Sequence, residues 1–181
     1  MTRTGAFTLT LLFLLVATSS IAIAADSIPD GPRRPIRTTD DRLRKLLDEG
    51  MRTSPTFRTL VERLHASDVV VYLRCDRVSP RAADGRLTFL SSAGGVRYVV
   101  VRMTHLQSRE RQIAIIAHEL RHAIEIADAP QIVDGPSLVR EYKRIGYVSL
   151  GSALPGITFD SQAAVEAGIQ VMRELMNGED D

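Results

Sequence analysis

The chain has 181 residues, and its 23 basic and 22 acidic side chains leave a formal net charge of +1. This balance provides no basic surface that would recruit nucleic acid. Cys75 is the only cysteine, which excludes an internal disulfide and favours a buried, inert thiol over a nucleophile.

The first 25 residues have the pattern of a secretory signal peptide. Arg3 supplies a positive start, residues 11–16 form an apolar run, and small residues at 22–24 offer a cleavage site. We therefore expect export to the periplasm or the extracellular space. An uncleaved membrane anchor through residues 6–25 is the alternative, although hydroxyl-bearing residues within that stretch argue against it.

About 155 residues remain after the signal peptide, which suits one domain with one hydrophobic core. Residues 26–39 are rich in proline, glycine and charge, and they predict a disordered leader. We place a single domain at residues 40–177 and a short acidic tail at 178–181.

Two helices are predicted at the start of this domain. Leucines recur at helical spacing from Asp40 to Glu49, and Gly50 follows as a stop. Ser54 and Pro55 then provide an N-cap and a first-turn proline for a second helix that ends near residue 65.

The hydrophobic pattern then changes to that of strands. Residues 69–73 are β-branched or aromatic and predict a buried strand. Residues 86–91 and 96–103 flank the glycine-containing segment 92–95, which predicts a β-hairpin. We therefore expect a small antiparallel sheet of three strands.

A long, mostly apolar helix is predicted between Ser108, a plausible N-cap, and Pro130. It contains the sequence HELRH at residues 118–122, which holds two of the four histidines of the chain. A short helix near 137–145, a loop at 151–156 and a final helix at 160–176 complete the domain.

The spacing within HELRH suits a metal site. On a helix, His118 and His122 lie one turn apart on one face, with Cβ atoms about 5–6 Å apart, so both imidazoles can reach one ion. Glu119 is rotated by roughly 100° and lies beside the ion, where a general base would stand. Burial of these polar groups among isoleucines is costly unless a metal satisfies them.

The HELRH helix, together with the predicted order of elements from 40 to 176, resembles the compact zincin fold of small gluzincin-type metallopeptidases. HELRH is the one specific motif of this resemblance. It implies an α+β fold, a zinc cofactor held by His118 and His122, and Glu119 as general base. It also implies that an extended peptide adds to an edge of the sheet, for which we expect Arg97–Met103.

A catalytic zinc ion usually takes a third protein ligand. We favour Asp160, which is expected to open the last helix above a small apolar face; Glu141, 19 residues after His122, is the alternative because its spacing resembles that of one gluzincin group. Glu125 reaches the ion poorly along the helix, so we expect it to orient His122 or His118 instead.

These features predict an exported zinc-dependent peptidase that acts on a peptide or protein, contacts membrane only through its signal segment and has an unspecified oligomeric state. Tyr142 and His105 are candidate donors to the oxyanion, and the spacing selects neither. A non-catalytic exported module that binds a partner or serves as a scaffold is the alternative, followed by a plain domain in which HELRH arose by chance.

Overall fold

The structure, a computed structural model, describes residues 34–76, 84–148 and 159–178. The predicted signal peptide (1–25) and the predicted loop (151–156) lie outside these ranges, as do most of the predicted leader and tail. Within the described ranges, no helix has the length and hydropathy that crossing a membrane requires.

The first two helices are α1, Asp41–Thr53, and α2, Pro55–His65. Asp40 and Ser54 cap them as their sequence positions predicted. The predicted end of the first helix at Gly50 is wrong, because α1 continues three residues further. Gly50 is needed for packing, since a Cβ there would lie 2.9 Å from the Phe57 ring.

The main sheet has four strands in the order β1-β2-β4-β3: β1 is Ile36–Arg37, β2 is Val69–Cys75, β3 is Gly85–Ala93 and β4 is Val96–Met103. β1 and β4 run parallel to β2, whereas β3 is antiparallel to β4. The sheet is therefore mixed, and the prediction of three antiparallel strands is wrong. The β3–β4 hairpin was predicted, but its second strand, not its first, pairs with β2.

β1 lies in the segment that was predicted to be disordered, and that prediction is wrong for these two residues. The backbone N–H of Val71 donates to the Pro35 carbonyl at 2.7 Å. Ile36 packs, partly buried, against the hydrophobic core. The segment forms a strand because β2 offers it a free edge.

The predicted edge at Arg97–Met103 is also wrong, because β4 is an inner strand. Val99, Val100 and Val101 are all buried, as expected for a strand covered on both faces. β3 is the edge strand beside β4, and its second half is exposed, whereas β1 forms the opposite edge of the sheet.

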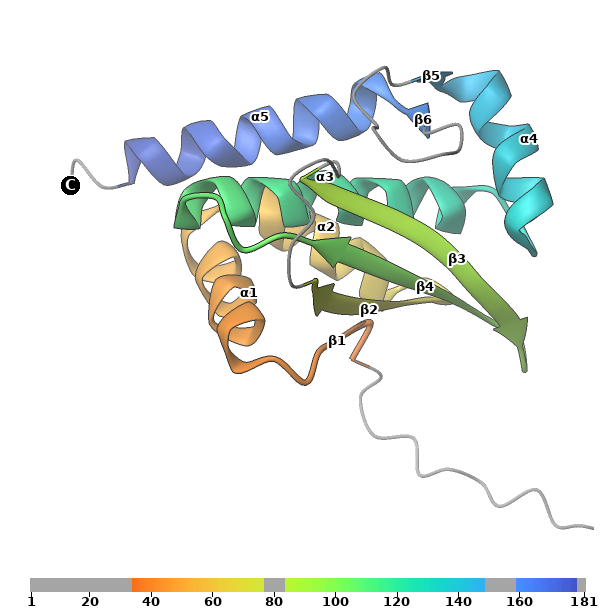
Figure 1. Cartoon of the computed structure of the whole chain (residues 1–181), viewed down its shortest axis with the longest axis horizontal. Helices are drawn as coiled ribbons and strands as arrows, with labels where there is room; N and C mark the ends of the chain where they lie inside the picture. Colours follow the sequence, from red (N-terminus) through yellow and green to blue (C-terminus); the bar gives the residue numbers. More distant parts are fainter. Residues whose placement is uncertain (1–33, 77–83, 149–158, 179–181) are drawn as a thin grey trace, which may run out of the picture. The chain divides into compact units, whose positions relative to one another are not determined.

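Helix α3, Arg109–Asp128, begins after the N-cap Ser108 and lies between the sheet and α5, Gln162–Asn177 (Figure 1). Along α3, thirteen side chains are buried, mostly alanine, isoleucine and leucine. α4, Gly135–Ile145, follows α3, and the two-residue strands β5, Tyr147–Val148, and β6, Phe159–Asp160, pair antiparallel. The N-cap of α5 is Ser161, so Asp160 precedes the helix instead of opening it.

Candidate metal centre

Two histidines of α3 project from the same face of the helix. The Nε2 atoms of His118 and His122 lie 3.2 Å apart, as the spacing of one helical turn allows. His122 is buried, with 8% of its side chain exposed, whereas His118 retains 24%. Both imidazoles therefore direct a donor nitrogen to one point.

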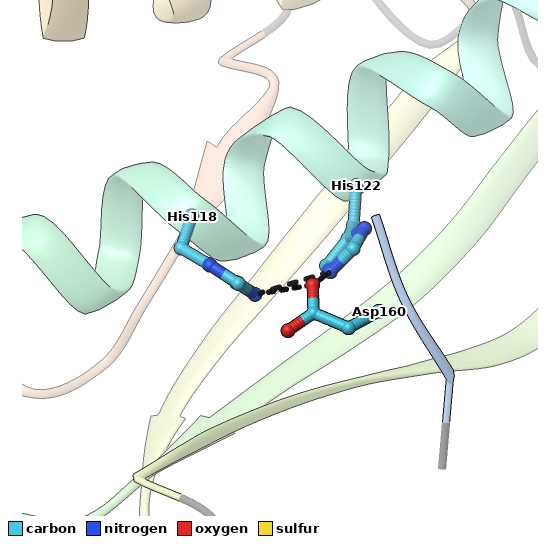
Figure 2. A group of neighbouring side chains, drawn as sticks. All are labelled: His118, His122 and Asp160. Atoms are coloured by element: carbon cyan, nitrogen blue, oxygen red, sulfur yellow. Dashed lines mark hydrogen bonds and ion pairs between the residues drawn. The ribbon is translucent and has the colours of Figure 1, made fainter. Parts of the chain in front are cut away.

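Asp160 reaches the same point from β6, 38 residues further along the chain. Its Oδ1 lies 3.3 Å from Nε2 of His118 and 3.4 Å from Nε2 of His122. Figure 2 shows the two rings extending from α3 toward this carboxylate. The three residues form a possible metal-binding group.

The alternative third donor, Glu141, is not part of this group. Its Oε2 accepts a hydrogen bond from Nε2 of Gln131 at 2.9 Å, and its Oε1 pairs with Arg144. These contacts hold the Glu141 carboxylate on α4. Sequence spacing alone could not exclude it, because the path of the chain between α3 and α4 decides where α4 lies.

The three donor atoms fit a tetrahedral metal ion. Zinc binds nitrogen and carboxylate oxygen at about 2.0–2.2 Å, which in a tetrahedral site separates neighbouring donors by about 3.4 Å. The observed separations are 3.2, 3.3 and 3.4 Å. Octahedral magnesium would separate them by about 3.0 Å and rarely takes two imidazoles. The donor types and their separations are therefore compatible with a metal ion that takes imidazole nitrogen and carboxylate oxygen, zinc among them.

Glu125 supports His122 from the opposite side of the ring. Its Oε2 lies 2.9 Å from Nδ1 of His122, and it accepts hydrogen bonds from Tyr142 at 2.7 Å and, at Oε1, from Ser161 at 2.6 Å. Burial raises the pKa of Glu125, but these hydrogen bonds together lower it below its usual value. An ionised Glu125 accepts a hydrogen bond from the protonated Nδ1 of His122. The lone pair of Nε2 is then directed at the metal position.

The two predicted oxyanion donors, Tyr142 and His105, both make other contacts in the structure. The Tyr142 hydroxyl lies 2.9 Å from Nδ1 of His122, on the side remote from Nε2, and donates its proton to Glu125. His105 does not line the cavity described below; its Nδ1 lies 3.7 Å from Sγ of Cys75. Cys75 is partly buried, and burial raises the pKa of its thiol, which fits an inert cysteine.

Glu119 lies on the neighbouring face of α3, buried against the edge strand β3. Burial raises the pKa of its carboxyl above the usual value, while the nearby histidines and a hydrogen bond from the Leu87 backbone oppose that shift. A Cβ at Gly85 would lie only 2.7 Å from Oε1 of Glu119. Sequence reasoning missed Gly85, although a glycine at the start of a strand indicates a close approach of another group.

In the metal-free protein, the donor group holds an additional proton on His122. Burial lowers the pKa of His122, but its hydrogen bonds to Asp160 and Glu125 raise it to about 9. Burial likewise raises the pKa of Asp160, and its contacts with His118 and His122 outweigh this and hold it far below the usual range. A bound metal ion would replace that proton.

The metal-binding group opens onto a cavity of about 1030 Å³. α3 forms its floor, β3 forms one wall and α5 the other, with α4 closing one end. His118, Glu119, His122 and Asp160 all line it. Apolar side chains contribute much of its lining, among them Leu138, Val139, Phe159, Val165 and Ile169.

No protein-family model, curated protein or solved structure matches this chain. The resemblance to gluzincin-type peptidases therefore rests on HELRH and on the order of the elements.

Proposed function

We propose that the protein is an exported zinc-dependent peptidase. The observation that carries this proposal is the near-equilateral triangle of donor atoms from His118, His122 and Asp160, whose edges suit tetrahedral zinc. A buried carboxylate with a raised pKa, that of Glu119, lies beside it. The pair of features supports hydrolysis, because a metal site alone would not need that acid.

In this proposal His118, His122 and Asp160 hold the ion. When bound, zinc supplies Lewis-acid chemistry, lowering the pKa of water and polarising a carbonyl. Glu119 takes one proton from the attacking water, whose oxygen adds to the peptide carbonyl carbon. As the carbon–nitrogen bond breaks, Glu119 donates that proton to the leaving amine. A raised pKa suits a carboxyl that must hold the proton between the two steps.

The edge strand β3 is the proposed platform for the substrate. It lines the cavity together with α3 and α5, and its side away from β4 is not paired with another strand of the described sheet. An extended peptide can add to such an edge through backbone hydrogen bonds. A peptide bound in this way would pass over His118 and Glu119, which line the same cavity as β3.

The test compares unsubstituted protein with Glu119→Gln. Both proteins are loaded with zinc, and both are assayed against a peptide library with products identified by mass spectrometry. We expect equal zinc affinity and a loss of hydrolysis of at least about 100-fold in Glu119→Gln. Glu62→Gln, on the exposed side of α2, is the matched control. Equal hydrolysis by both proteins would remove the assigned role of Glu119.

A non-catalytic exported binding module is the second candidate. It is favoured by the hydrogen bond from the Leu87 backbone to Glu119, which turns the carboxylate toward β3. The same experiment separates the candidates. Tight zinc binding without turnover by the unsubstituted protein identifies the binding module.

A further inference from the structure

The cavity has a second end, about two helical turns from His118, where two arginines line it. α3 and α5 run antiparallel along the cavity (Figure 1). Ser161 at the start of α5 contacts Glu125, and Gly168 lies against Ala114, where a Cβ would be 3.2 Å from the carbonyl oxygen. Following this register, Arg173 of α5 comes level with the first turns of α3.

Arg111 stands on those first turns of α3 and also lines the cavity. Its side chain is 54% exposed, and its Nη2 lies 3.4 Å from Oδ2 of Asp84 at the start of β3. Asp84 is shared, because its Oδ1 accepts a hydrogen bond from Gln107 at 2.8 Å. Arg111 therefore keeps most of its donors available.

Arg173 lines the same end of the cavity and is exposed. Within the described residues it has no hydrogen bond, ion pair or ring contact. Arg111 and Arg173 therefore bring two guanidinium groups to this end of the cavity, where Arg111 lies beside Asp84 and Arg173 has no partner among the described residues.

The distance from the metal position sets what could reach these arginines. Arg111 precedes His118 by seven residues, which is about 10 Å along a helix. An extended peptide advances about 3.3 Å per residue. In an extended peptide whose scissile bond lies at the metal position, a side chain about three residues away would therefore lie beside Arg111 and Arg173.

Building on the proposed function, we propose that Arg111 and Arg173 form a carboxylate subsite of the peptide-binding cavity. The substrate carries an acidic side chain, or its own terminal carboxylate, about three residues from the scissile bond. The planar guanidinium fork binds a carboxylate through two parallel hydrogen bonds, which suits this chemistry. β3 runs from Asp84 toward α4, so a peptide antiparallel to β3 has its C-terminal side at the arginines.

The first measurement uses hydrolysis by the zinc-loaded protein. Each peptide has one bulky apolar core, an amidated C-terminus and a single Asp, which stands at the second, third, fourth or fifth residue after the core. A matched peptide carries Asn at the same position. A further peptide ends with a free carboxylate at the third residue. We expect cleavage at least about fivefold faster when a carboxylate stands about three residues beyond the broken bond, and the two carboxylate sources are told apart by these arms.

The second measurement uses binding, with zinc-loaded Glu119→Gln so that peptides are not consumed. Fluorescence anisotropy should show the Asp peptide binding at least about fivefold more tightly than the Asn peptide. Adding Arg111→Gln and Arg173→Gln together should abolish the difference. Lys45→Gln and Arg52→Gln together, two exposed positions on α1, also remove two positive charges and should retain it.

Equal binding of the Asp and Asn peptides, or a preference that survives the double substitution, overturns the subsite. Hydrolysis without any carboxylate preference would also overturn it, while leaving the peptidase proposal intact. A carboxylate preference in binding without hydrolysis by the unsubstituted protein supports the subsite and removes the peptidase.

Discussion

The Ser161 hydroxyl donates a 2.6 Å hydrogen bond to Oε1 of Glu125 and thereby ties the start of α5 to the last turn of α3. Glu125 in turn holds Nδ1 of His122 at 2.9 Å. Because Asp160 directly precedes Ser161, this contact controls how far the third donor lies from the two imidazoles. The geometry of the metal-binding group therefore depends on a bond between two residues that do not belong to it.

Ser161→Ala should weaken both the fold and the metal site. The hydroxyl also accepts a hydrogen bond from the Ala164 backbone at 3.1 Å, as the N-cap of α5. We expect a loss of about 1–2 kcal/mol in the free energy of unfolding, and zinc affinity lower by about 10–100-fold. Urea unfolding and zinc titration against a chromophoric chelator measure the two effects. Ser161→Thr, which keeps the hydroxyl, should retain both properties; unchanged zinc affinity in Ser161→Ala would contradict the prediction.

The C-terminal end of α3 is held by one buried guanidinium, that of Arg97 on β4, which is 5% exposed. It pairs with both carboxylate oxygens of Asp68 at 2.6 and 2.7 Å. It also donates to carbonyl oxygens at the end of α3 and just beyond, those of Ile126, Ala127, Ala129 and Ile132. Ile126 and Ala127 belong to the last turn of α3, where carbonyls lack the partners that a continuing helix would supply. The Ile126 and Ala129 carbonyls each also accept one backbone hydrogen bond.

Arg97→Lys should destabilise the domain by about 2–4 kcal/mol, because one ammonium cannot reproduce the fork and leaves buried carbonyls unsatisfied. The measurement is the free energy of unfolding in urea, followed by circular dichroism. Arg102→Lys lies on the same strand with half of its side chain exposed, and it should change stability by less than about 0.5 kcal/mol. Equal unfolding midpoints for the two variants would show that Arg97 is not needed as a cap.

Local patterns predicted the helices well, because their caps and apolar stripes are encoded within a few residues. Ser54 and Ser108 cap α2 and α3 as expected. The order of the strands was not predictable, since pairing of β2 with β4 depends on contacts between distant segments. The strand at Ile36 was not predicted for the same reason. Two residues are too few to show a periodic pattern, and they form a strand only because the edge of β2 gives them a partner.

The candidate site, like the fold, could be predicted from the sequence only where its geometry is local. His118 and His122 converge because helical spacing is local geometry. The structure brings Asp160 to them, but from β6, since Ser161 takes the capping position that was expected for Asp160. The orientation of Tyr142 was beyond sequence reasoning, because it is set by Glu125 on another helix.

Gly85→Ala should separate hydrolysis from metal binding. The added Cβ would lie 2.7 Å from Oε1 of Glu119 and 2.7 Å from Cγ2 of Ile115, so the carboxylate must move while the donor group is untouched. We expect hydrolysis to fall at least about tenfold, since a misplaced base costs proton-transfer efficiency. Zinc affinity should stay within about threefold.

Gly135→Ala is the control for that variant. Gly135 also lines the cavity, yet an added Cβ meets nothing within 4 Å. It should leave both zinc affinity and hydrolysis unchanged. If Gly85→Ala lowered zinc affinity as strongly as hydrolysis, its effect would be on the fold of the site and not on Glu119.

The stability of the metal-free fold should depend on pH, because the pKa of His122 is raised from 6.5 to about 9. A raised pKa stabilises the fold fully below pH 6.5, and this contribution is lost as pH rises toward 9. The carboxylates of Asp160 and Glu125 have lowered pKa values, so they stay ionised throughout this window. In excess chelator, the free energy of unfolding should therefore decline over this range, by on the order of 1–3 kcal/mol.

Zinc must displace the His122 proton, so its affinity should rise over the same window by about tenfold per pH unit. Stability with zinc and stability without it should therefore diverge as pH increases. Urea unfolding at several pH values, in chelator and in buffered zinc, measures both trends. His65→Gln, at the exposed end of α2, should leave them unchanged. A metal-free protein whose stability is flat between pH 6.5 and 9 would show that no proton is shared between His122 and the carboxylates.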